Sequence, residues 1–321
     1  MNQYLEVAKQ AVKAASEICR DVQKQLVKED TLIKKDRSPV TVADYASQAS
    51  ICRVLKERFP QMPIVGEEDA ADLRKPENKE TLEKIAGFLT GWDEQEILTA
   101  IDYGNGEPND LFWTLDPIDG TKGFLRGDQY AVALALIKNG EPVLGVLGCP
   151  NLALPGVEDG GVLAFAVQGE GAFYQGLNGG QSHPLKVAPN ASDGEVRFLE
   201  SVESGHANHG LQGTIMGAFG DRIRSVRYDS QVKYAVLSAG MADVYLRLPN
   251  PKSPDYREKI WDHAAGVAIV REAGGKVSDM FGKPLDFTAG KKLTENRGVV
   301  VTNCVVHDEI IRLIRQAAEG N

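Results

Sequence analysis

The chain has 321 residues, of which 42% are hydrophobic and 25% charged, and its formal net charge is −9. This composition is typical of a soluble globular protein with two domains or one large layered domain. A nucleic-acid polymer is excluded as a partner, because such partners are bound by basic surfaces. No apolar run is long enough to span a membrane, so no membrane partner is expected.

The cysteines and the N-terminal segment indicate the cellular compartment of the protein. Cys19, Cys52, Cys149 and Cys304 are far apart in the sequence and form no CxxC pair, which is typical of free thiols in a reducing compartment. The N-terminal segment carries charges throughout and lacks the apolar core of a secretory signal. We therefore expect a cytoplasmic protein.

Hydrophobic spacing in the first half predicts helices followed by antiparallel strands. Residues 2–28 and 42–59 have helical periodicity, and Thr41 stands where the second helix would begin. A short strand is expected to end at Gly66, and one helix near residues 77–89 should interrupt an otherwise polar loop. Strands are predicted at four further places, namely residues 111–115, two runs within 130–150 joined by an Asn-Gly turn, and a hairpin over 161–176.

From about residue 190 the pattern changes to strands that alternate with helices. Helices are predicted over 230–240, 261–275 and 307–320, and strands near 196–203, 225–230, 242–249 and 298–303. Such alternation favours a more parallel α/β unit. The fold class is therefore α+β, with an N-terminal domain over residues 1–188 and a C-terminal domain over 189–321.

The segment DPIDGT places two carboxylates at the end of a predicted strand. Asp116 and Asp119 are three residues apart, so both can face one side of a turn, with the carbonyl of Ile118 between them. Gly120 and Thr121 begin a predicted helix, whose free N–H groups can bind a phosphate. Considered alone, the segment is better explained as a plain Asp-rich turn.

Three more carboxylates stand at the ends of predicted elements, and each has an ordinary explanation. Asp44 forms a T-x-x-D capping box with Thr41. Glu67 lies with Glu68 in a loop, and Asp262 stands where the N-cap of a helix belongs. Together with the DPIDGT pair, however, these oxygen donors are the ligands that Mg²⁺ prefers.

The motifs VGEE, DPIDGT and WDHAAG resemble the signature segments of the inositol monophosphatase superfamily, whose members are Mg²⁺-dependent, lithium-sensitive phosphatases. Within it, SPVTVADYASQ, WTLDPIDGTKGFLRG, SVESGH and DSQVKYAVLSAGMADVYLRLP are similar to segments of the 3′(2′),5′-bisphosphate nucleotidases. Matching segments extend from residue 38 to residue 275. The resemblance implies a layered αβαβα sandwich with the site between its two halves.

The same resemblance implies two or three bound Mg²⁺ ions and an activity that Li⁺ inhibits. Glu67, Asp116 and the Ile118 carbonyl would hold the first ion. Asp116, Asp119 and Asp262 would hold the second ion. The N-terminal domain thus carries most of the metal ligands, and the C-terminal domain adds Asp262.

A catalytic pair is also implied. Asp44 and Thr121 would form a hydrogen-bonded pair that orients the attacking water, and a weaker third ion would lie near Glu67 and Asp44. Gly120, Thr121 and Asp262 would contact the substrate as well. Attack in line on the 3′-phosphorus would release phosphate without a covalent intermediate.

The nucleotide end of the substrate needs other residues. Ser230 and Lys233 are three residues apart in a predicted helix, so both can face one cavity. By resemblance Lys233 and Arg247 would bind a 5′-phosphate, with Ser230 nearby. His206 would contact the nucleotide near its base, although His209 is a competitor for that role.

The resemblance implies a nucleotidase that converts adenosine 3′,5′-bisphosphate to AMP and phosphate, and that also accepts 3′-phosphoadenylyl sulfate. The alternative within enzymes is an inositol polyphosphate 1-phosphatase, acting for example on inositol 1,4-bisphosphate. A nucleotide-binding sensor without catalysis is a third reading, but every expected acidic residue is present. We expect a monomer, and the sequence leaves the roles of Lys122 and Arg126 open.

Overall fold

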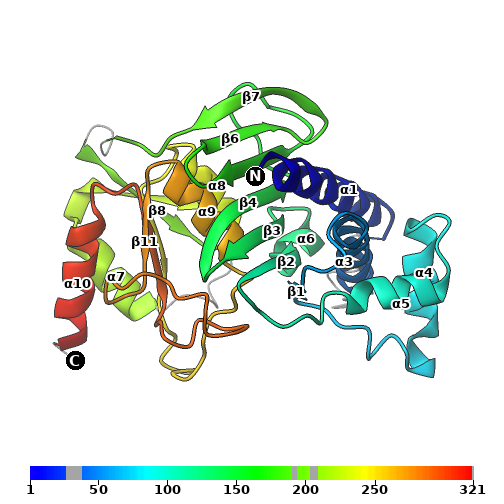
Figure 1. Ribbon diagram of the computed structural model, residues 1–321. Coiled ribbons are helices and arrows are strands. Elements are labelled where there is room, and N and C mark those ends of the chain that lie inside the picture. Colours follow the sequence, from blue (N-terminus) through cyan, green and yellow to red (C-terminus); the bar gives the residue numbers. More distant parts are fainter. Residues whose placement is uncertain (27–37, 190–193, 203–208, 320–321) are drawn as a thin grey trace.

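The computed structural model describes residues 1–26, 38–189, 194–202 and 209–319. Helices and sheets alternate in five layers, which confirms the predicted αβαβα sandwich (Figure 1). The helix layers are, in order, α1 (Asn2–Leu26) with α3 (Ser38–Arg58), α8 (Val232–Ser238) with α9 (Ala264–Glu272), and α7 (His209–Gly217) with α10 (His307–Glu319). None of the helices in the described ranges is both long and apolar enough to cross a membrane.

The first sheet has seven strands in the order of the sequence. The strands are β1 (Ile64–Gly66), β2 (Leu111–Asp119), β3 (Ala131–Lys138), β4 (Glu141–Cys149), β5 (Val162–Val167), β6 (Gly171–Gly176) and β7 (Gly179–Leu185). Only the β1–β2 pair is parallel. Asn139 and Gly140 both have positive φ angles, 51° and 77°, which confirms the predicted Asn-Gly hairpin turn.

The second sheet has five strands in the order β11-β12-β10-β8-β9. Its strands are β8 (Val196–Glu200), β9 (Ile223–Arg227), β10 (Val244–Arg247), β11 (Lys276–Ser278) and β12 (Val299–Thr302). The sheet is mixed, since β8 is parallel to both of its neighbours while β12 is antiparallel to both of its own. The expected parallel character therefore holds for only half of this sheet.

Several helix boundaries differ from the sequence-based expectation. Helix α3 begins at Ser38, because a proline is tolerated in a first turn; Thr41 and Asp44 therefore lie inside the helix, and the predicted capping box is wrong. Helix α4 (Lys79–Phe88) is confirmed. Helix α5 (Glu94–Asp102) replaces part of the predicted loop and has a complete capping box formed by Asp93 and Glu96.

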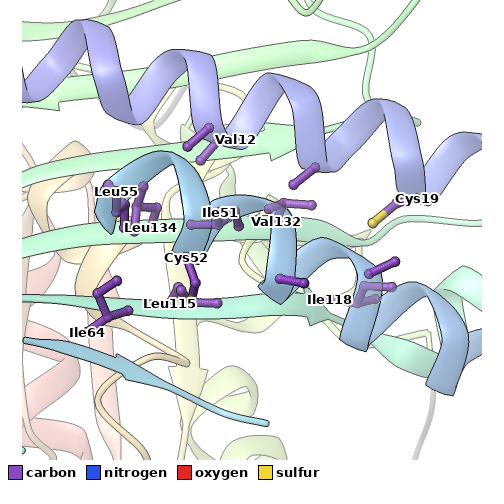
Figure 2. Close-up of a cluster of buried hydrophobic side chains, with 14 of the residues drawn as sticks. Val12, Cys19, Ile51, Cys52, Leu55, Ile64, Leu115, Ile118, Val132 and Leu134 are labelled. Atoms are coloured by element: carbon purple, nitrogen blue, oxygen red, sulfur yellow. The ribbon is translucent and has the colours of Figure 1, made fainter. Parts of the chain in front are cut away.

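Apolar side chains of α1 and α3 pack on one face of the first sheet (Figure 2). Val12, Ile51 and Leu55 from the helices meet Leu115 and Leu134 from the strands. Burying each such side chain contributes roughly 1.5–3 kcal/mol. This packing holds α3 against β2 and so fixes the strand from which two of the proposed metal ligands project. On the opposite face of the sheet, α9 packs against β3, β4 and β5; the division of the chain at residue 188 stays a prediction.

Candidate active site

A cavity of about 510 Å³ is lined by residues of both halves of the chain. Its walls come from the end of β2, from α6 (Thr121–Arg126), from the start of α8, from β10 and from the segment before α9. The sequence-predicted residues that line it are Glu67, Asp116, Ile118, Asp119, Gly120, Thr121, Ser230, Lys233, Arg247 and Asp262. Segments more than a hundred residues apart in sequence are thus brought to one place.

The turn between β2 and α6 aims both aspartates of DPIDGT into this cavity. Asp116 pairs with Ala133 and Asp119 with Ala131, and the register shifts between the two pairs, as in a β-bulge. Gly120 then turns the chain at a φ of 94°. A Cβ atom at this position would lie 2.8 Å from the Cβ of Ser230. Only glycine therefore satisfies both the backbone conformation and the close approach of the two halves.

Burial, and after it the charges of neighbouring carboxylates, raise the pKa values of Glu67 and Asp116 in this cavity. Burial, together with the charges of Glu67, Asp119 and Asp262, holds the pKa of Asp116 well above its usual range. Burial and the neighbouring Glu68 charge raise the pKa of Glu67 to about 7. Burial, opposed by Arg247, raises the pKa of Asp262 to about 6. Such clustered oxygen donors fit a hard divalent cation such as Mg²⁺, which would relieve the repulsion.

A second group of possible metal ligands consists of Glu258, Asp262 and His263, whose carboxylate oxygens and ring nitrogen lie within 4.8 Å of one another. Two of its members are already engaged. Glu258 pairs with Arg247 Nε at 2.6 Å and with His263 Nε2 at 3.2 Å, while His263 Nδ1 bonds to the Tyr234 hydroxyl at 2.7 Å. Asp262, the third member, lines the cavity, and its Oδ2 lies 3.8 Å from Arg247 Nη2.

The expected helix-capping role of Asp262 is therefore wrong. His263 is the N-cap residue of α9, and its own side chain makes no capping hydrogen bond. The Arg247 contact and the open cavity draw the Asp262 carboxylate away from the helix end. His263, expected from the sequence to be structural, is buried.

Two cations, Lys233 and Arg247, also line the cavity; we call the part that they line its basic end and the part that the carboxylates line its acidic end. Lys233 is buried, its Nζ donates to Ser201 Oγ at 2.8 Å, and it lies 4.7 Å from the centre of the Tyr245 ring. Burial and the nearby Arg247 charge lower the pKa of Lys233 to about 8. Ser230 has a φ of 62°, a left-handed conformation that is costly for a residue other than glycine.

The proposed catalytic pair is only partly assembled by the fold. Thr121 lines the cavity. Asp44 is buried on α3, and among the described residues its Oδ1 has no hydrogen-bond partner. Burial and the charges of Glu68 and Glu67 hold the pKa of Asp44 well above its usual range. His206 lies outside the described residues, as does the side chain of His209.

Sequence reasoning did not find several residues of the cavity. Six more residues contribute to it or hold its side chains in place, namely Ser201, Asp229, Gln231, Tyr234, Tyr245 and Glu258. Asp229 and Gln231 flank Ser230 in the DSQVK motif, which is the only signal that could have indicated them. Of the two residues left open, Lys122 lines the cavity, and Arg126 pairs with Asp229 at 2.6 Å and with Asp128 at 2.7 Å.

Comparison with known proteins agrees with this fold. The family model described as "Inositol monophosphatase family" matches residues 1–319 of this chain. The chain therefore belongs to the inositol monophosphatase family, and it is a phosphoric monoester hydrolase. The family membership expected from its motifs is confirmed.

Relatives place the chain more narrowly within this family. It is 42% identical to 3′(2′),5′-bisphosphate nucleotidase 1 of Candida albicans, with 99% of this chain and 96% of the relative covered. It is 42% identical to the 3′(2′),5′-bisphosphate nucleotidase of Schizosaccharomyces pombe, with 95% and 93% covered. Among solved structures, CysQ of Bacteroides thetaiotaomicron matches with a TM-score of 0.62 at 24% identity over 94% of this chain and 97% of that one, a likeness of fold. The predicted resemblance to nucleotidases is thus confirmed.

Proposed function

We propose that the protein is an Mg²⁺-dependent 3′(2′),5′-bisphosphate nucleotidase that hydrolyses adenosine 3′,5′-bisphosphate to AMP and phosphate. The observation that carries the proposal is the lining of the cavity, which combines four carboxylates with the two cations Lys233 and Arg247. A substrate with two phosphates suits both sets of groups. The names of the relatives point to the same reaction, and 3′-phosphoadenylyl sulfate is proposed as a second substrate.

At the acidic end, the chain supplies ligands and a means of orienting water. Glu67, Asp116 and the Ile118 carbonyl would hold one ion, and Asp116, Asp119 and Asp262 a second, with a third near Asp44. When bound, Mg²⁺ lowers the pKa of coordinated water and neutralises charge that develops on the phosphate.

The remaining steps at this end are carried by side chains and the helix start. Asp44 and Thr121 would orient the attacking water and accept its proton at the Asp44 carboxylate, whose Oδ1 has no hydrogen-bond partner among the described residues. The free N–H groups after Gly120 would bind the oxygens of the 3′-phosphate. The Asp44–Thr121 pair and these N–H groups would both act on the phosphate that is transferred.

At the basic end, the chain holds the phosphate that is not transferred. The Lys233 ammonium is fixed by Ser201 and Tyr245, and the Arg247 guanidinium by Glu258. Such fixed cations bind a second phosphate without first having to be ordered. Ser230 and His206 would contact the rest of the nucleotide.

Phosphate release with Mg²⁺ from four substrates tests the proposal. We expect turnover of adenosine 3′,5′-bisphosphate and 3′-phosphoadenylyl sulfate, and little from inositol 1,4-bisphosphate or inositol monophosphate, with inhibition by Li⁺. Preference for inositol 1,4-bisphosphate would instead make the protein an inositol polyphosphate 1-phosphatase. Nucleotide binding without any release would identify a sensor.

A variant separates the two ends of the cavity. Lys233→Met should raise KM for adenosine 3′,5′-bisphosphate by about 10- to 100-fold, the usual loss for a charged hydrogen bond. It should leave hydrolysis of 3′-AMP, which lacks the second phosphate, little changed. Lys138→Met, at an exposed position, is the matched control; equal effects of Lys233→Met on both substrates would contradict the assignment.

We further propose that the protein is a cytoplasmic monomer whose metal ligands come mainly from residues 1–188. Cys19, Cys52, Cys149 and Cys304 are all free, which suits a reducing compartment. The cavity takes residues from both parts of one chain. Light scattering would measure the oligomeric state directly.

A further inference from the structure

Gln231 lies at the point where the two halves of the active site meet, and sequence reasoning assigned it no role. It is buried, with 1% of its surface exposed, and it directly precedes α8. Its backbone N–H and both groups of its side-chain amide contact segments that carry a proposed metal ligand.

The backbone of Gln231 contacts the first of these segments. Its N–H donates to Asp119 Oδ2 at 2.6 Å. Ser230 has a left-handed conformation, at a φ of 62°, and fits closely against Gly120. This fit brings the segment before α8 next to the turn that carries Asp119. The bond fixes one oxygen of the Asp119 carboxylate and leaves the other for the cavity.

The side chain of Gln231 contacts the second segment. Its Nε2 donates to the Trp261 carbonyl at 2.9 Å, and its Oε1 accepts from Gly266 N–H at 3.2 Å. Trp261 immediately precedes Asp262, and Gly266 lies in the first turn of α9. Both ends of the amide are therefore used to fix the strand-to-helix segment that presents Asp262.

We propose that Gln231 is a positioning residue, which sets the separation of the Asp119 and Asp262 carboxylates and thereby the affinity of the site they share for a divalent cation. The inference rests on the proposed function, because the shared Mg²⁺ site is part of it. Residues that orient metal ligands typically change metal affinity or activity by about 10- to 100-fold when replaced. Gln231 supplies this support from one residue to ligands of two different elements.

Gln231→Met tests the proposal, because it keeps the backbone bond to Asp119 and approximate side-chain volume but removes both amide bonds. Mg²⁺ binding is measured by titration calorimetry in the absence of substrate, and phosphate release is measured across Mg²⁺ concentrations. We expect Mg²⁺ affinity to fall by about 10- to 100-fold. Phosphate release should fall at low Mg²⁺ and recover at high Mg²⁺, with KM for the nucleotide unchanged at saturating Mg²⁺.

Gln212→Met is the matched control, since Gln212 is also a buried glutamine but lies on α7 and does not line the cavity. Unchanged Mg²⁺ affinity in Gln231→Met, or an equal loss in Gln212→Met, would overturn the proposal. If Gln231→Met gives no cooperative thermal transition, the milder Gln231→Asn is measured in the same way and judged by the same outcomes. Weakened Mg²⁺ binding in a protein that hydrolyses no bisphosphate would reject the proposed function and support the positioning role.

Discussion

Two buried aspartates show how neighbours decide whether a buried carboxylate stabilises this protein. Asp243 accepts hydrogen bonds from Arg197 Nε at 2.8 Å, from Arg197 Nη2 at 2.9 Å and from Asn303 Nδ2 at 2.9 Å. Asp116 accepts one from Ile118 N–H at 3.1 Å and otherwise faces the charges of Glu67 and other acids. Asp243 is thus compensated by a cation, whereas Asp116 is not.

Asp116→Asn should abolish phosphate release and, without metal, make the fold more stable. The amide keeps the acceptor for Ile118 and removes the repelled charge. Because the folded pKa of Asp116 is raised, ionisation at neutral pH destabilises the folded state, so we expect a gain of about 0.5–2 kcal/mol in the free energy of unfolding, the usual range for relieving a strained functional site. Urea unfolding with EDTA at pH 7.5 measures it.

Asp243→Asn provides the contrast for this measurement. It leaves the Arg197 guanidinium with a weaker partner, so we expect a loss of stability, and the variant should keep phosphate release in its folded fraction. A loss of stability in both variants would show that the repulsion at Asp116 is not the controlling energy.

The sequence predicted the acidic and basic residues of the cavity better than the residues that hold them in place. DPIDGT, VGEE and WDHAAG indicated the proposed metal ligands through their acidic residues and their resemblance to a known family. Gln231 and Glu258 act through contacts with segments distant in sequence, which no local pattern records. Capping preferences misled at Asp44 because α3 begins earlier, at Ser38, and at Asp262 because its carboxylate lies beside Arg247 in the cavity.

At the scale of elements, the tail of WTLDPIDGTKGFLRG has a physical role in joining α6 to the C-terminal half. Arg126 pairs with Asp229 at 2.6 Å, and the Asp229 Oδ1 accepts from Val202 N–H at 3.0 Å. Asp229 precedes Ser230, and Val202 follows Ser201. The pair therefore fixes the two segments that support the basic end of the cavity.

A double-mutant cycle on Arg126→Ala and Asp229→Asn tests this connection. The pair is largely shielded, with 22% and 11% of the two side chains exposed. We expect a coupling energy of about 0.5–3 kcal/mol in unfolding and an increase in KM larger than any decrease in kcat. Arg271 and Glu141, a more exposed pair that does not line the cavity, serve as the control cycle; equal KM changes in both cycles would contradict a role in substrate binding.

His307 joins three elements and makes their packing sensitive to acid. Its ring nitrogens each bond at 3.0 Å to a hydroxyl, Nε2 to Ser278 at the end of β11 and Nδ1 to Thr302 at the end of β12. Burial and then Lys276 lower its pKa to about 4, against a partial opposing effect of Asp308. The folded protein therefore keeps the ring neutral where the unfolded chain takes up a proton.

The consequence is a stabilisation that is complete above pH 6.5 and lost as pH falls from 6.5 towards 4. Its full size is about 2 kcal/mol once solvent screening is allowed for. The free energy of unfolding should fall less steeply over this range in His307→Gln than in the unmodified protein. His183→Gln should retain the steep fall; identical pH profiles for all three proteins would show that His307 does not control it.

Long periodic elements were predicted reliably, whereas short ones and boundaries were not. The hairpins of the first sheet follow from their turns and alternating burial. Helix α5 was missed although Asp93 and Glu96 stand three residues apart as a capping box requires, because its surface is mostly polar. The mixed second sheet could not be derived, since the direction of β12 depends on a connection that has no local sequence pattern.

At the scale of the whole molecule, the two halves contribute like charges to one cavity, and this repulsion opposes their association. Glu67 and Asp116 come from the first half and Asp262 from the second, and burial raises the pKa of each. Raised carboxyl pKa values mean that the folded state binds more protons than the unfolded chain. Ionisation of Glu67 and Asp262 therefore removes stability as pH rises through about 6 to 7.

Mg²⁺ should reverse this loss and stabilise the molecule as a unit. A ligand at a hundred times its Kd stabilises the folded state by about 2.7 kcal/mol, which corresponds to a rise in Tm of roughly 5 °C for a chain of this size. Protonated carboxyls bind Mg²⁺ poorly, so the rise in Tm should be larger at pH 8 than at pH 6. Calorimetric melting with MgCl₂ or EDTA measures it. Asp262→Asn should remove most of the rise and the exposed-site control Asp221→Asn none of it; a full rise in Asp262→Asn would mean that the cation does not bridge the halves.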